Sequence, residues 1–277
     1  MNESLEHEVA RHYGATGLLE RIHAALEAGG VDPSSLTAED LAPVDEFHVG
    51  GRPATIHAVA RLGLGPGDRV LDIGCGIGGA ARYMAERFGC RVTGIDLTPE
   101  YVATARALAK LTRLHGRVDY QVGSALDLPF EAASFDAAVT IHVAMNIPDR
   151  ERFYGEVARV IEPGRLFCVY DIMGSDAAPF AYPVPWAETA ATSRLVSVAE
   201  MRELLGAAGF AVEHEEDRRQ FALDYFHERL AQAQDGPPPL GLHLVMGESA
   251  RPKFENILAN IEKGCVSPVL MIARLAG

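Results

Sequence analysis

Two spacings of apolar residues divide the chain near residue 60. In residues 1–60 apolar side chains recur at helical intervals, and no stretch alternates as a half-buried strand would. The first helix predicted there carries Leu18, Leu19, Ile22, Ala25 and Leu26 and ends at Gly29-Gly30. The segment 45–51 is polar and glycine-rich, which predicts a loop. A second helix follows Arg52 and is expected to turn toward the core Ile56, Val59, Ala60 and Leu62. Residues 1–60 are therefore predicted to form a helical N-terminal extension that serves as a lid.

From residue 61 short apolar runs alternate with helical patterns. The runs predict strands at 69–73, 91–95, 118–122, 135–141, 165–172, 210–216 and 266–275. Helix starts are indicated by Thr98 before Pro99, by Asp149, and by Ser197 with Glu200 as a capping box. Strands that alternate with helices through short connections predict an α/β fold with a doubly wound, mostly parallel sheet. Such a sheet binds ligands at the carboxyl ends of its strands.

Two segments interrupt this alternation within residues 61–277. Residues 173–196 contain three prolines and Trp186 and predict a long loop without regular structure. Residues 220–263 are read as helices broken at 235–239, where Asp-Gly precedes three prolines. Both segments are expected to be cap insertions in the main domain, 61–277.

Composition and charge narrow the partners. The chain has 277 residues, of which 48% are hydrophobic and 23% charged, as in an ordinary globular protein. A formal charge of -13 argues against nucleic acid as a partner, because binding phosphates requires clustered cations. The four cysteines are scattered and are expected to be reduced, buried thiols. An acidic N-terminus and the lack of any apolar run long enough to span a membrane predict a cytoplasmic location.

The candidate chemistry begins at a glycine-rich turn after the first strand of the sheet. The four glycines are Gly74, Gly76, Gly78 and Gly79. A turn of this kind lets the backbone and the first amides of the next helix approach a ligand. The spacing fits a dinucleotide fingerprint and also a second pattern that begins at Asp72. Asp96, 22 positions after Gly74, suits a ribose diol in either case. Asp72 favours the second pattern, because a carboxylate there would repel a pyrophosphate but attract an ammonium and a sulfonium.

Four motifs in register resemble those of the class I S-adenosylmethionine-dependent methyltransferases. They are residues 71–79, 94–97, 128–130 and 135–139, and the resemblance runs from about residue 64 to 276. It implies a Rossmann-like, seven-stranded, mostly parallel sheet with an antiparallel last strand, and S-adenosyl-L-methionine as cofactor.

The resemblance also implies residue roles. Asp72, Gly74 and Gly76 would hold the methionine portion of the cofactor, with Cys75 and Gly78 in the same turn. Asp96 would hold the ribose diol. Leu97 would cover one face of the adenine, and Ala125 and Leu126 would line its edge. Ser124 stands where the family often has Asp, and its hydroxyl can still accept from the adenine amino group. His142 is expected beside the cofactor as well.

The acceptor site is expected beyond the fourth strand. Segments 45–51 and 141–147 are similar to small-molecule methyltransferases, of which the sarcosine and dimethylglycine type is nearest and the plant tocopherol type more distant. His142 is the first candidate for a catalytic base or an acceptor contact, and packing against the backbone is the alternative. Further candidates for the acceptor pocket are His48, Met145, Asn146, Tyr182 and Trp186. Asn146, Asp149 and Asp171 follow adjacent strands, as oxygen ligands of a metal would. Asp149 is better explained as a helix cap, so no metal is predicted.

The function predicted from the sequence is S-adenosylmethionine-dependent methylation of a small-molecule acceptor. The acceptor would displace the methyl group from the sulfonium in line, and the enzyme would accelerate this step mainly by positioning the two reactants. N-methylation of a small amine is slightly favoured, and O- or C-methylation of a natural product or a prenyl or quinone-type acceptor is the alternative. Two other classes are a nicotinamide-dependent oxidoreductase and a cofactor-binding protein without catalysis. Against the oxidoreductase, no Tyr is followed by Lys four positions later.

Overall fold

Seven strands form one sheet in the part of the chain that the structure describes. The computed structural model describes residues 6, 8–10, 17–175, 179–232 and 238–277. The strands are β1 Arg69–Ile73, β2 Arg91–Asp96, β3 Val118–Val122, β4 Phe135–Ile141, β5 Ile161–Gly174, β6 Phe210–Asp217 and β7 Val266–Leu275. Their order is β3-β2-β1-β4-β5-β7-β6. Neighbours from β3 to β5 are parallel, whereas β7 is antiparallel to both β5 and β6. The Rossmann-like fold with an antiparallel last strand is confirmed.

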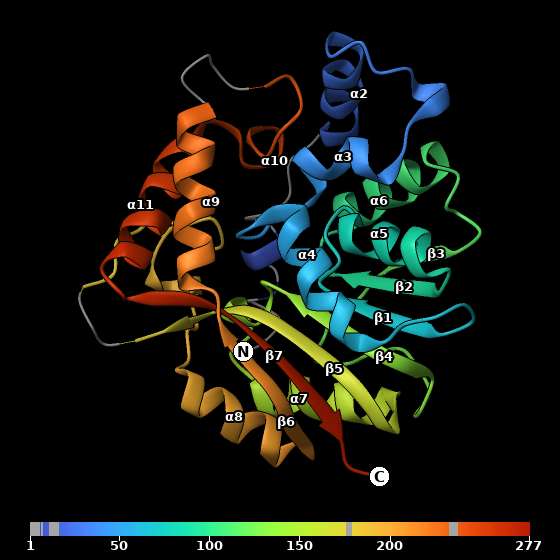
Figure 1. Ribbon diagram of the computed structural model, residues 1–277, viewed down its shortest axis with the longest axis vertical. Helices are drawn as coiled ribbons and strands as arrows, with labels where there is room; N and C mark the ends of the chain where they lie inside the picture. The colour runs from blue at the N-terminus through green and yellow to red at the C-terminus, as the bar shows by residue number, and fades with distance from the viewer. Residues whose placement is uncertain (1–5, 7, 11–16, 176–178, 233–237) are drawn as a thin grey trace.

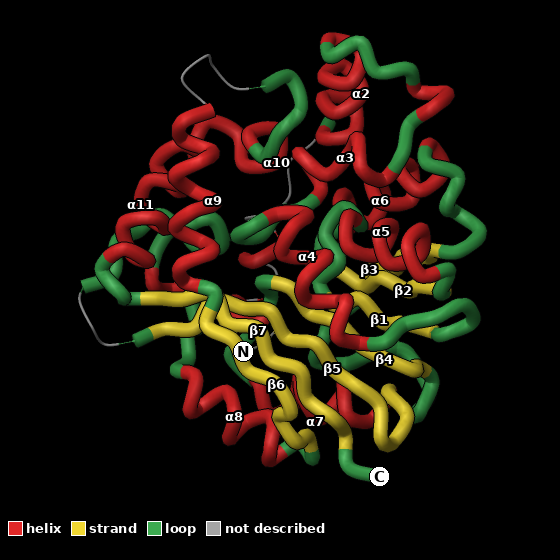
Figure 2. Tube along the Cα trace, in the orientation of Figure 1, coloured by secondary structure: helices red, strands yellow, loops and turns green. Residues whose placement is uncertain are grey.

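Helices cover both faces of this sheet, as Figures 1 and 2 show. They are α2 Leu18–Ala28, α3 Ala38–Asp45, α4 Gly51–Val59, α5 Gly79–Phe88, α6 Pro99–Leu111, α7 Arg150–Val160, α8 Val198–Ala207, α9 Arg219–Gln232, α10 His243–Met246 and α11 Ala250–Glu262. Apolar residues of α4, α5 and α6 form one core on the first face. Those of α7 and α8 form another on the opposite face. Because both faces are covered, the strands are apolar on both sides and only the sheet edges and strand ends remain for function.

The strand register places the carboxyl ends of β1, β2 and β4 next to one another. Asp72 of β1 pairs with Gly94 of β2 and with Val139 of β4. These strands therefore end side by side, with Asp96 as the last residue of β2 and with Gly74 and His142 directly after β1 and β4.

Helix caps were predicted with mixed success. Ser197 and Glu200 form the expected capping box, and Asp149 accepts from the backbone N–H of Arg152. Thr98 is the N-cap of α6, but its side chain makes no capping hydrogen bond. Asp96 Oδ1 accepts from the Thr98 amide at 2.9 Å and so ties the end of β2 to the start of α6.

The buried face of α4 differs from the prediction. Ile56 is 43% exposed and Ala60 is exposed too, whereas Ala54, Thr55 and Ala58 are buried. The helix is rotated because Arg52 and Thr55 hydrogen-bond or ion-pair with buried Glu46. A polar network thus overrides the apolar pattern.

The chain after the helix α7 was also misread in part. β5 begins at Ile161, four residues before the predicted strand 165–172, because Ile161 pairs with Phe135 of β4. Residues 173–196 are not wholly irregular, since β5 continues to Gly174 and a 3-10 helix spans Ala190–Thr192.

The remaining helices stand above the carboxyl ends of the strands. α9 and α11 share a core with the loop residues Val184 and Trp186, and α10 joins α2 and α3 in another. In Figure 2 both groups stand on the same side of the sheet. α10, a member of the second group, lies on the side of that group that faces α9. None of the described helices is long and apolar enough to cross a membrane. That residues 1–60 serve as a lid and 220–263 as a cap stays a prediction.

Candidate functional site

A first cavity lies at the carboxyl ends of β1, β2 and β4. Its volume is 160 Å³. Nine of the residues predicted to bind the cofactor line it: Asp72, Gly74, Cys75, Gly76, Asp96, Leu97, Ala125, Leu126 and His142. Sequence positions far apart are therefore brought to one site by the sheet register.

The glycine turn packs tightly against neighbouring residues at Gly74 and has open space next to Gly76. Gly74 has φ 73°, and a Cβ there would lie 2.3 Å from Val143 Cγ2. The amides of Gly74 and Cys75 both donate to the Ile95 carbonyl. Gly76 has φ 53°, and a Cβ there would have no atom within 4 Å. The open space over Gly76 lets a ligand approach the backbone closely.

Asp96 is held by two backbone amides. Its Oδ2 accepts from Gly76 N at 2.9 Å and its Oδ1 from Thr98 N at 2.9 Å. Burial raises its pKa, while these two amides oppose the shift. Each carboxylate oxygen keeps a further lone pair, so the group can still accept from the two hydroxyls of a ribose.

Asp72 is a buried carboxylate without a full set of partners. Its Oδ2 has no hydrogen-bond partner among the described residues. Burial raises its pKa to about 7, and the nearby charge of Asp96 adds to the rise. An orphaned carboxylate in a cavity wall favours a cationic ligand. The residues present thus fit the ammonium and sulfonium of S-adenosylmethionine.

Two predicted cofactor residues lie outside the lining of this cavity. Gly78 begins α5 with φ 85°, and a Cβ there would lie 2.4 Å from the Tyr120 hydroxyl, so the glycine is needed for packing. Ser124 donates to Glu6 and accepts from Leu126 N at 3.0 Å. Glu6 and Val245 do line the cavity, and no motif marked either of them.

A second, larger cavity of 930 Å³ adjoins the first. It lies between α9, α10 and α11 on one side and α3 and α4 on the other. Its apolar wall contains Phe47, Val49, Met145, Trp186, Tyr225, Phe226, Leu230, Leu240, Leu242 and Phe254. Glu46, Phe47, His48 and His142 line both cavities. The two cavities therefore meet at these four residues.

The predicted acceptor residues divide between the two cavities. His48, Met145 and Trp186 line the second cavity. Asn146 lines the first, and its Nδ2 donates to the carbonyls of Trp186 and Thr192 at 2.9 and 3.0 Å. Tyr182 lines neither, because its ring packs 4.7 Å from that of Phe180.

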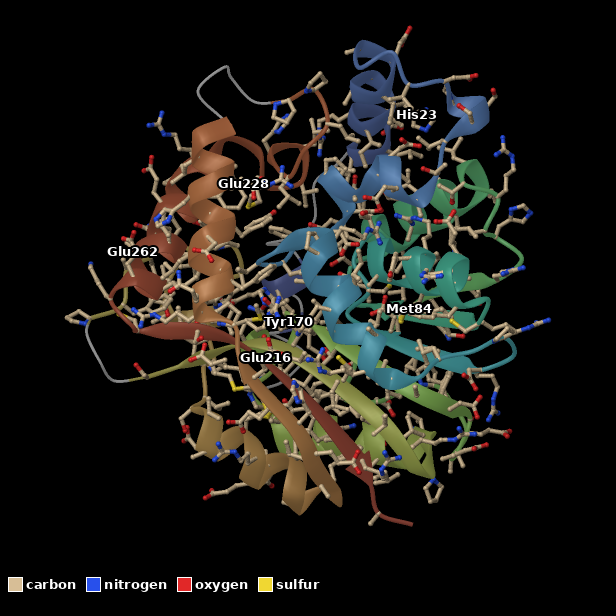
Figure 3. All side chains as sticks on the ribbon, viewed as in Figure 1. His23, Met84, Tyr170, Glu216, Glu228 and Glu262 are labelled. Carbon is tan, nitrogen blue, oxygen red and sulfur yellow. The ribbon has the colours of Figure 1, made fainter. Side chains whose placement is uncertain are left out.

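His48 and His142 face each other where the cavities meet, with ring centroids 5.8 Å apart. His48 Nε2 lies 3.1 Å from the Gly51 carbonyl, which places its proton on Nε2 and its lone pair on Nδ1. His142 Nδ1 lies 3.4 Å from the Val49 amide and accepts from it, so His142 Nε2 carries the proton. This buried Nε2 has no partner among the described residues. Figure 3 labels Tyr170, whose ring lies 5.0 Å from that of His142, near the middle of the molecule.

Burial keeps both imidazoles neutral. It lowers the pKa of His48 to about 4, with the charge of Arg52 adding to the effect, and it lowers the pKa of His142 well below its usual value. The neutral pair thus presents one lone pair and one N–H.

A buried charge cluster lies behind His48. Arg82 Nη2 lies 2.6 Å from Asp45 Oδ2, and Arg52 Nη1 lies 2.7 Å from Glu46 Oε1. Glu46 also accepts from the Thr55 hydroxyl at 2.6 Å, and that oxygen is 3.1 Å from His48 Nε2. Burial raises the pKa of Glu46 to about 8 against the opposing charge of Arg52. Glu46, Thr55 and His48 thus form a continuous polar chain.

The three oxygen-bearing residues considered for a metal serve the backbone instead. Asp149 caps α7, Asn146 holds the 186–192 loop, and Asp171 accepts from Ile172 N at 2.9 Å. Within the described ranges no three acidic, His or Cys side chains converge as a metal site.

Known proteins match the part of the chain that builds the first cavity. The sequence model of a family described as methyltransferase domain matches residues 71–169. An O-methyltransferase of Pyrenophora dematioidea is 30% identical over 64% of this chain and 67% of that protein. A sterol 24-C-methyltransferase of Eremothecium gossypii is 32% identical over 57% of this chain. The match spans only 44% of that sterol enzyme, or less than half its length.

Solved structures share the fold over more of the chain. Geranyl diphosphate C-methyltransferase of Streptomyces coelicolor A3(2), solved with Mg²⁺, geranyl diphosphate and S-adenosyl-L-homocysteine, is 18% identical. It has a TM-score of 0.70 over 98% of this chain and 97% of that one. A protein of Galdieria sulphuraria assigned as a sarcosine dimethylglycine methyltransferase is also 18% identical, with a TM-score of 0.65 over 80% of this chain and 83% of that one. The family match and the 30% identity over 67% of the Pyrenophora dematioidea enzyme show that this chain belongs to the S-adenosylmethionine-dependent methyltransferases.

Proposed function

We propose that this protein methylates an oxygen of a bulky, largely apolar small molecule bound in the second cavity. The observation that carries the proposal is the junction of the two cavities at His48 and His142. A methyl donor in the first cavity and an acceptor in the second would meet there. Bound S-adenosylmethionine supplies an electrophilic methyl group on a positively charged sulfur.

The size and lining of the second cavity favour a large acceptor. A volume of 930 Å³ is at the upper end of ligand pockets, which run to about 1,000 Å³. Most of the lining is aromatic or aliphatic, and Glu46, the acid at its junction with the first cavity, already lies beside Arg52. A small charged amine would leave this space unfilled, and the three acids that line it, Glu39, Glu46 and Glu255, each already pair with an arginine. Of the acceptors that the sequence left open, the natural-product type therefore has more support than the small amine.

The polar chain at the junction supports oxygen as the reacting atom. His48 Nδ1 carries a lone pair and can take the hydroxyl proton as the methyl group is transferred. The His48 Nε2 proton lies beside Thr55 and Glu46, whose pKa of about 8 is above the value of about 4 for His48. Glu46 therefore keeps its own proton until the pH approaches about 8, and its carboxylate, once formed, stabilises the protonated imidazole. His142, with its proton on Nε2, would donate to an oxygen at the junction, which is the acceptor contact and not the base among the two roles that its place in the sequence favoured.

Transfer of labelled methyl groups to an acceptor panel tests the proposal. The panel combines polycyclic phenols and prenylated phenols with sarcosine, dimethylglycine and ethanolamine. We expect methyl ethers from the large phenols. Faster methylation of the small amines would contradict the acceptor class, and failure to form S-adenosylhomocysteine with any acceptor would favour a cofactor-binding protein without catalysis.

Variants of the polar chain test the base. His48→Gln is expected to lower kcat by a factor of about 10² to 10⁴, the usual contribution of a general base. His214→Gln is a matched control, because His214 lies on β6 and lines neither cavity. Equal losses in both variants would contradict the role of His48.

The pH–rate profile gives a second measurement. Because the pKa of Glu46 is raised, its carboxylate forms only as the pH rises toward about 8. We expect kcat to rise with pH through that range and the Glu46→Gln variant to lose this dependence. A rising limb that is unchanged in Glu46→Gln would exclude Glu46 as its source.

A further inference from the structure

We propose that the hydroxyl of Tyr225, on α9, orients the reacting oxygen of the acceptor beside His48. The proposal rests on the proposed function and assigns a specificity-determining residue from the cap, a part of the chain in which the sequence marked no acceptor contact on a helix.

Two glycines bring α9 against the loop that carries His48. Gly50 and Gly51 have φ of 93° and 51°, conformations that suit glycine. A Cβ on Gly50 would lie 2.4 Å from Phe221 Cε1, and a Cβ on Gly51 would lie 3.2 Å from the Tyr225 hydroxyl. Phe221 and Tyr225 are four residues apart and share one face of α9. This face therefore rests directly on the glycine pair.

The Tyr225 hydroxyl and His48 lie near the same residue. The carbonyl of Gly51 binds His48 Nε2 at 3.1 Å, and the α-carbon of Gly51 faces the Tyr225 hydroxyl. Tyr225, His48 and His142 all line the second cavity. An acceptor bound in this cavity can therefore contact both His48 and the phenolic donor from the α9 wall.

The ring of Tyr225 packs against neighbouring side chains, whereas its hydroxyl makes no hydrogen bond among the described residues. The Arg229 guanidinium lies 5.3 Å from the ring centroid, and the Phe226 ring packs edge-on at 5.8 Å. The hydroxyls of Tyr120, Tyr154 and Tyr170 each donate to Gly78, Met201 and Val49 respectively. Within the described ranges the Tyr225 hydroxyl has no such partner. It is available to a ligand on a side chain that is already oriented.

A phenol is suited to this task because it can donate to the acceptor oxygen while His48 takes the proton from it. Two directional contacts fix the oxygen in line with the methyl group, whereas the apolar wall alone would fix only the body of the acceptor. Tyr225 would then select which hydroxyl of a polyhydroxylated molecule reacts.

The test removes the hydroxyl from the protein and from the ligand in turn. Dissociation constants of 2-naphthol and naphthalene are measured with protein saturated with S-adenosylhomocysteine. We expect the wild type to prefer 2-naphthol by about tenfold, as one hydrogen bond allows, and Tyr225→Phe to reduce the preference to about twofold. A merely structural role would change both dissociation constants together and leave their ratio unchanged.

Tyr83→Phe is a matched control. Tyr83 is also half-buried and also has an arginine over its ring, Arg52 at 5.0 Å, but it lines neither cavity. It should keep the wild-type ratio. A wild-type ratio near one, or the same ratio in wild type and Tyr225→Phe, would overturn the inference. Binding of 2-naphthol without methyl transfer from S-adenosylmethionine would count against the proposed function alone, because the ratio still decides the contact with Tyr225.

Discussion

Asp96 organises the cofactor cavity even before a ligand binds. Its two oxygens accept from Gly76 N and Thr98 N and so join the glycine turn to the start of α6. Asp96→Ala removes these contacts together with the predicted acceptor for a ribose diol. Affinity for S-adenosylmethionine is expected to fall by about 1–3 kcal/mol in calorimetric titration. Asp119→Ala, at an exposed position of β3, should leave the affinity unchanged; equal affinities for the two variants would contradict the assignment.

Asp72 makes cofactor affinity depend on pH. Its pKa is raised to about 7 in the free protein, so the carboxyl holds a proton over much of the range below neutral pH. A bound ammonium stabilises the carboxylate, and binding therefore releases this proton. Affinity should rise by up to about tenfold per pH unit between about pH 5 and 7, where the cofactor amine stays protonated. Titrations in buffers of different ionisation enthalpy measure both the affinity and the released proton.

The Asp72→Asn variant separates this effect from other titrations. It should bind more weakly, with an affinity that changes little over the same pH range. A slope identical to that of the wild type would show that another group is responsible. The sign for folding is the reverse: the raised pKa means that the folded, cofactor-free protein holds the proton longer than the unfolded chain, so its stability falls as pH rises between about 4 and 7.

At the residue scale, the sequence predicted the groups whose neighbours are close in the chain. Asp72 and Asp96 stand at strand ends with fixed spacing to the glycine turn, so their cavity positions follow from local pattern. Tyr225 and Val245 reach the same region from α9 and α10, more than a hundred residues later in the chain. The spacing of apolar residues does not predict that these two side chains reach the cavities, because their positions depend on how the helices pack over the sheet.

At the element scale, a buried ion pair joins the N-terminal extension to the cofactor turn. Arg82 of α5 is fully buried, donates to the Ile77 carbonyl at 2.8 Å and pairs with Asp45 at the end of α3. Asp45→Asn leaves the arginine charge without its partner and is expected to cost about 3–5 kcal/mol of unfolding free energy, measured by urea denaturation.

The exposed pair of Glu213 and Arg274 is the control for that prediction. Its side chains approach to 2.6 Å but are almost half exposed. Glu213→Gln should therefore lower the unfolding free energy by less than about 1 kcal/mol. Similar small losses in both variants would mean that the Arg82 pair contributes no more than a surface pair.

The same cluster explains why Ile56 was predicted on the wrong side of α4, although Val59 is buried as predicted. Apolar spacing places Ile56 inward, but the buried side is chosen by Arg52 and Thr55, whose partners come from the preceding loop. Helix starts such as Ser197, with its partner three residues away, were predictable because the whole capping motif is local. Elements were thus well predicted where their determinants are neighbours in sequence, and less well where a polar network decides.

At the scale of the whole molecule, catalysis should not require a metal. The candidate ligands Asp149, Asn146 and Asp171 each hydrogen-bond to backbone groups. Turnover is expected to stay within about twofold of its starting value in excess chelator, because positioning and proton transfer supply the acceleration. Loss of turnover with EDTA, and its return with added Mg²⁺, would contradict this prediction.

The seven-stranded sheet could be predicted as a whole, whereas the acceptor cavity could not. Alternating strands and helices determine the first through rules of connection that hold across α/β proteins. The second lies between α3, α4 and the α9–α11 helices, which contact each other through apolar side chains that any helix could carry. Its volume and the position of Tyr225 therefore had to come from the structure.

The place of β7 in the sheet has a consequence for biosynthesis. β6 has β7 as its neighbour, and β5 pairs with β7 from Leu166 to Gly174. On the ribosome, β6 is made long before residues 266–275 leave the exit tunnel. Until then one edge of β5 stays open and β6 has no place in the sheet. Exposed strand edges recruit other chains. The yield of folded protein should therefore depend on chaperones that bind the nascent chain during the synthesis of its last helix and strand.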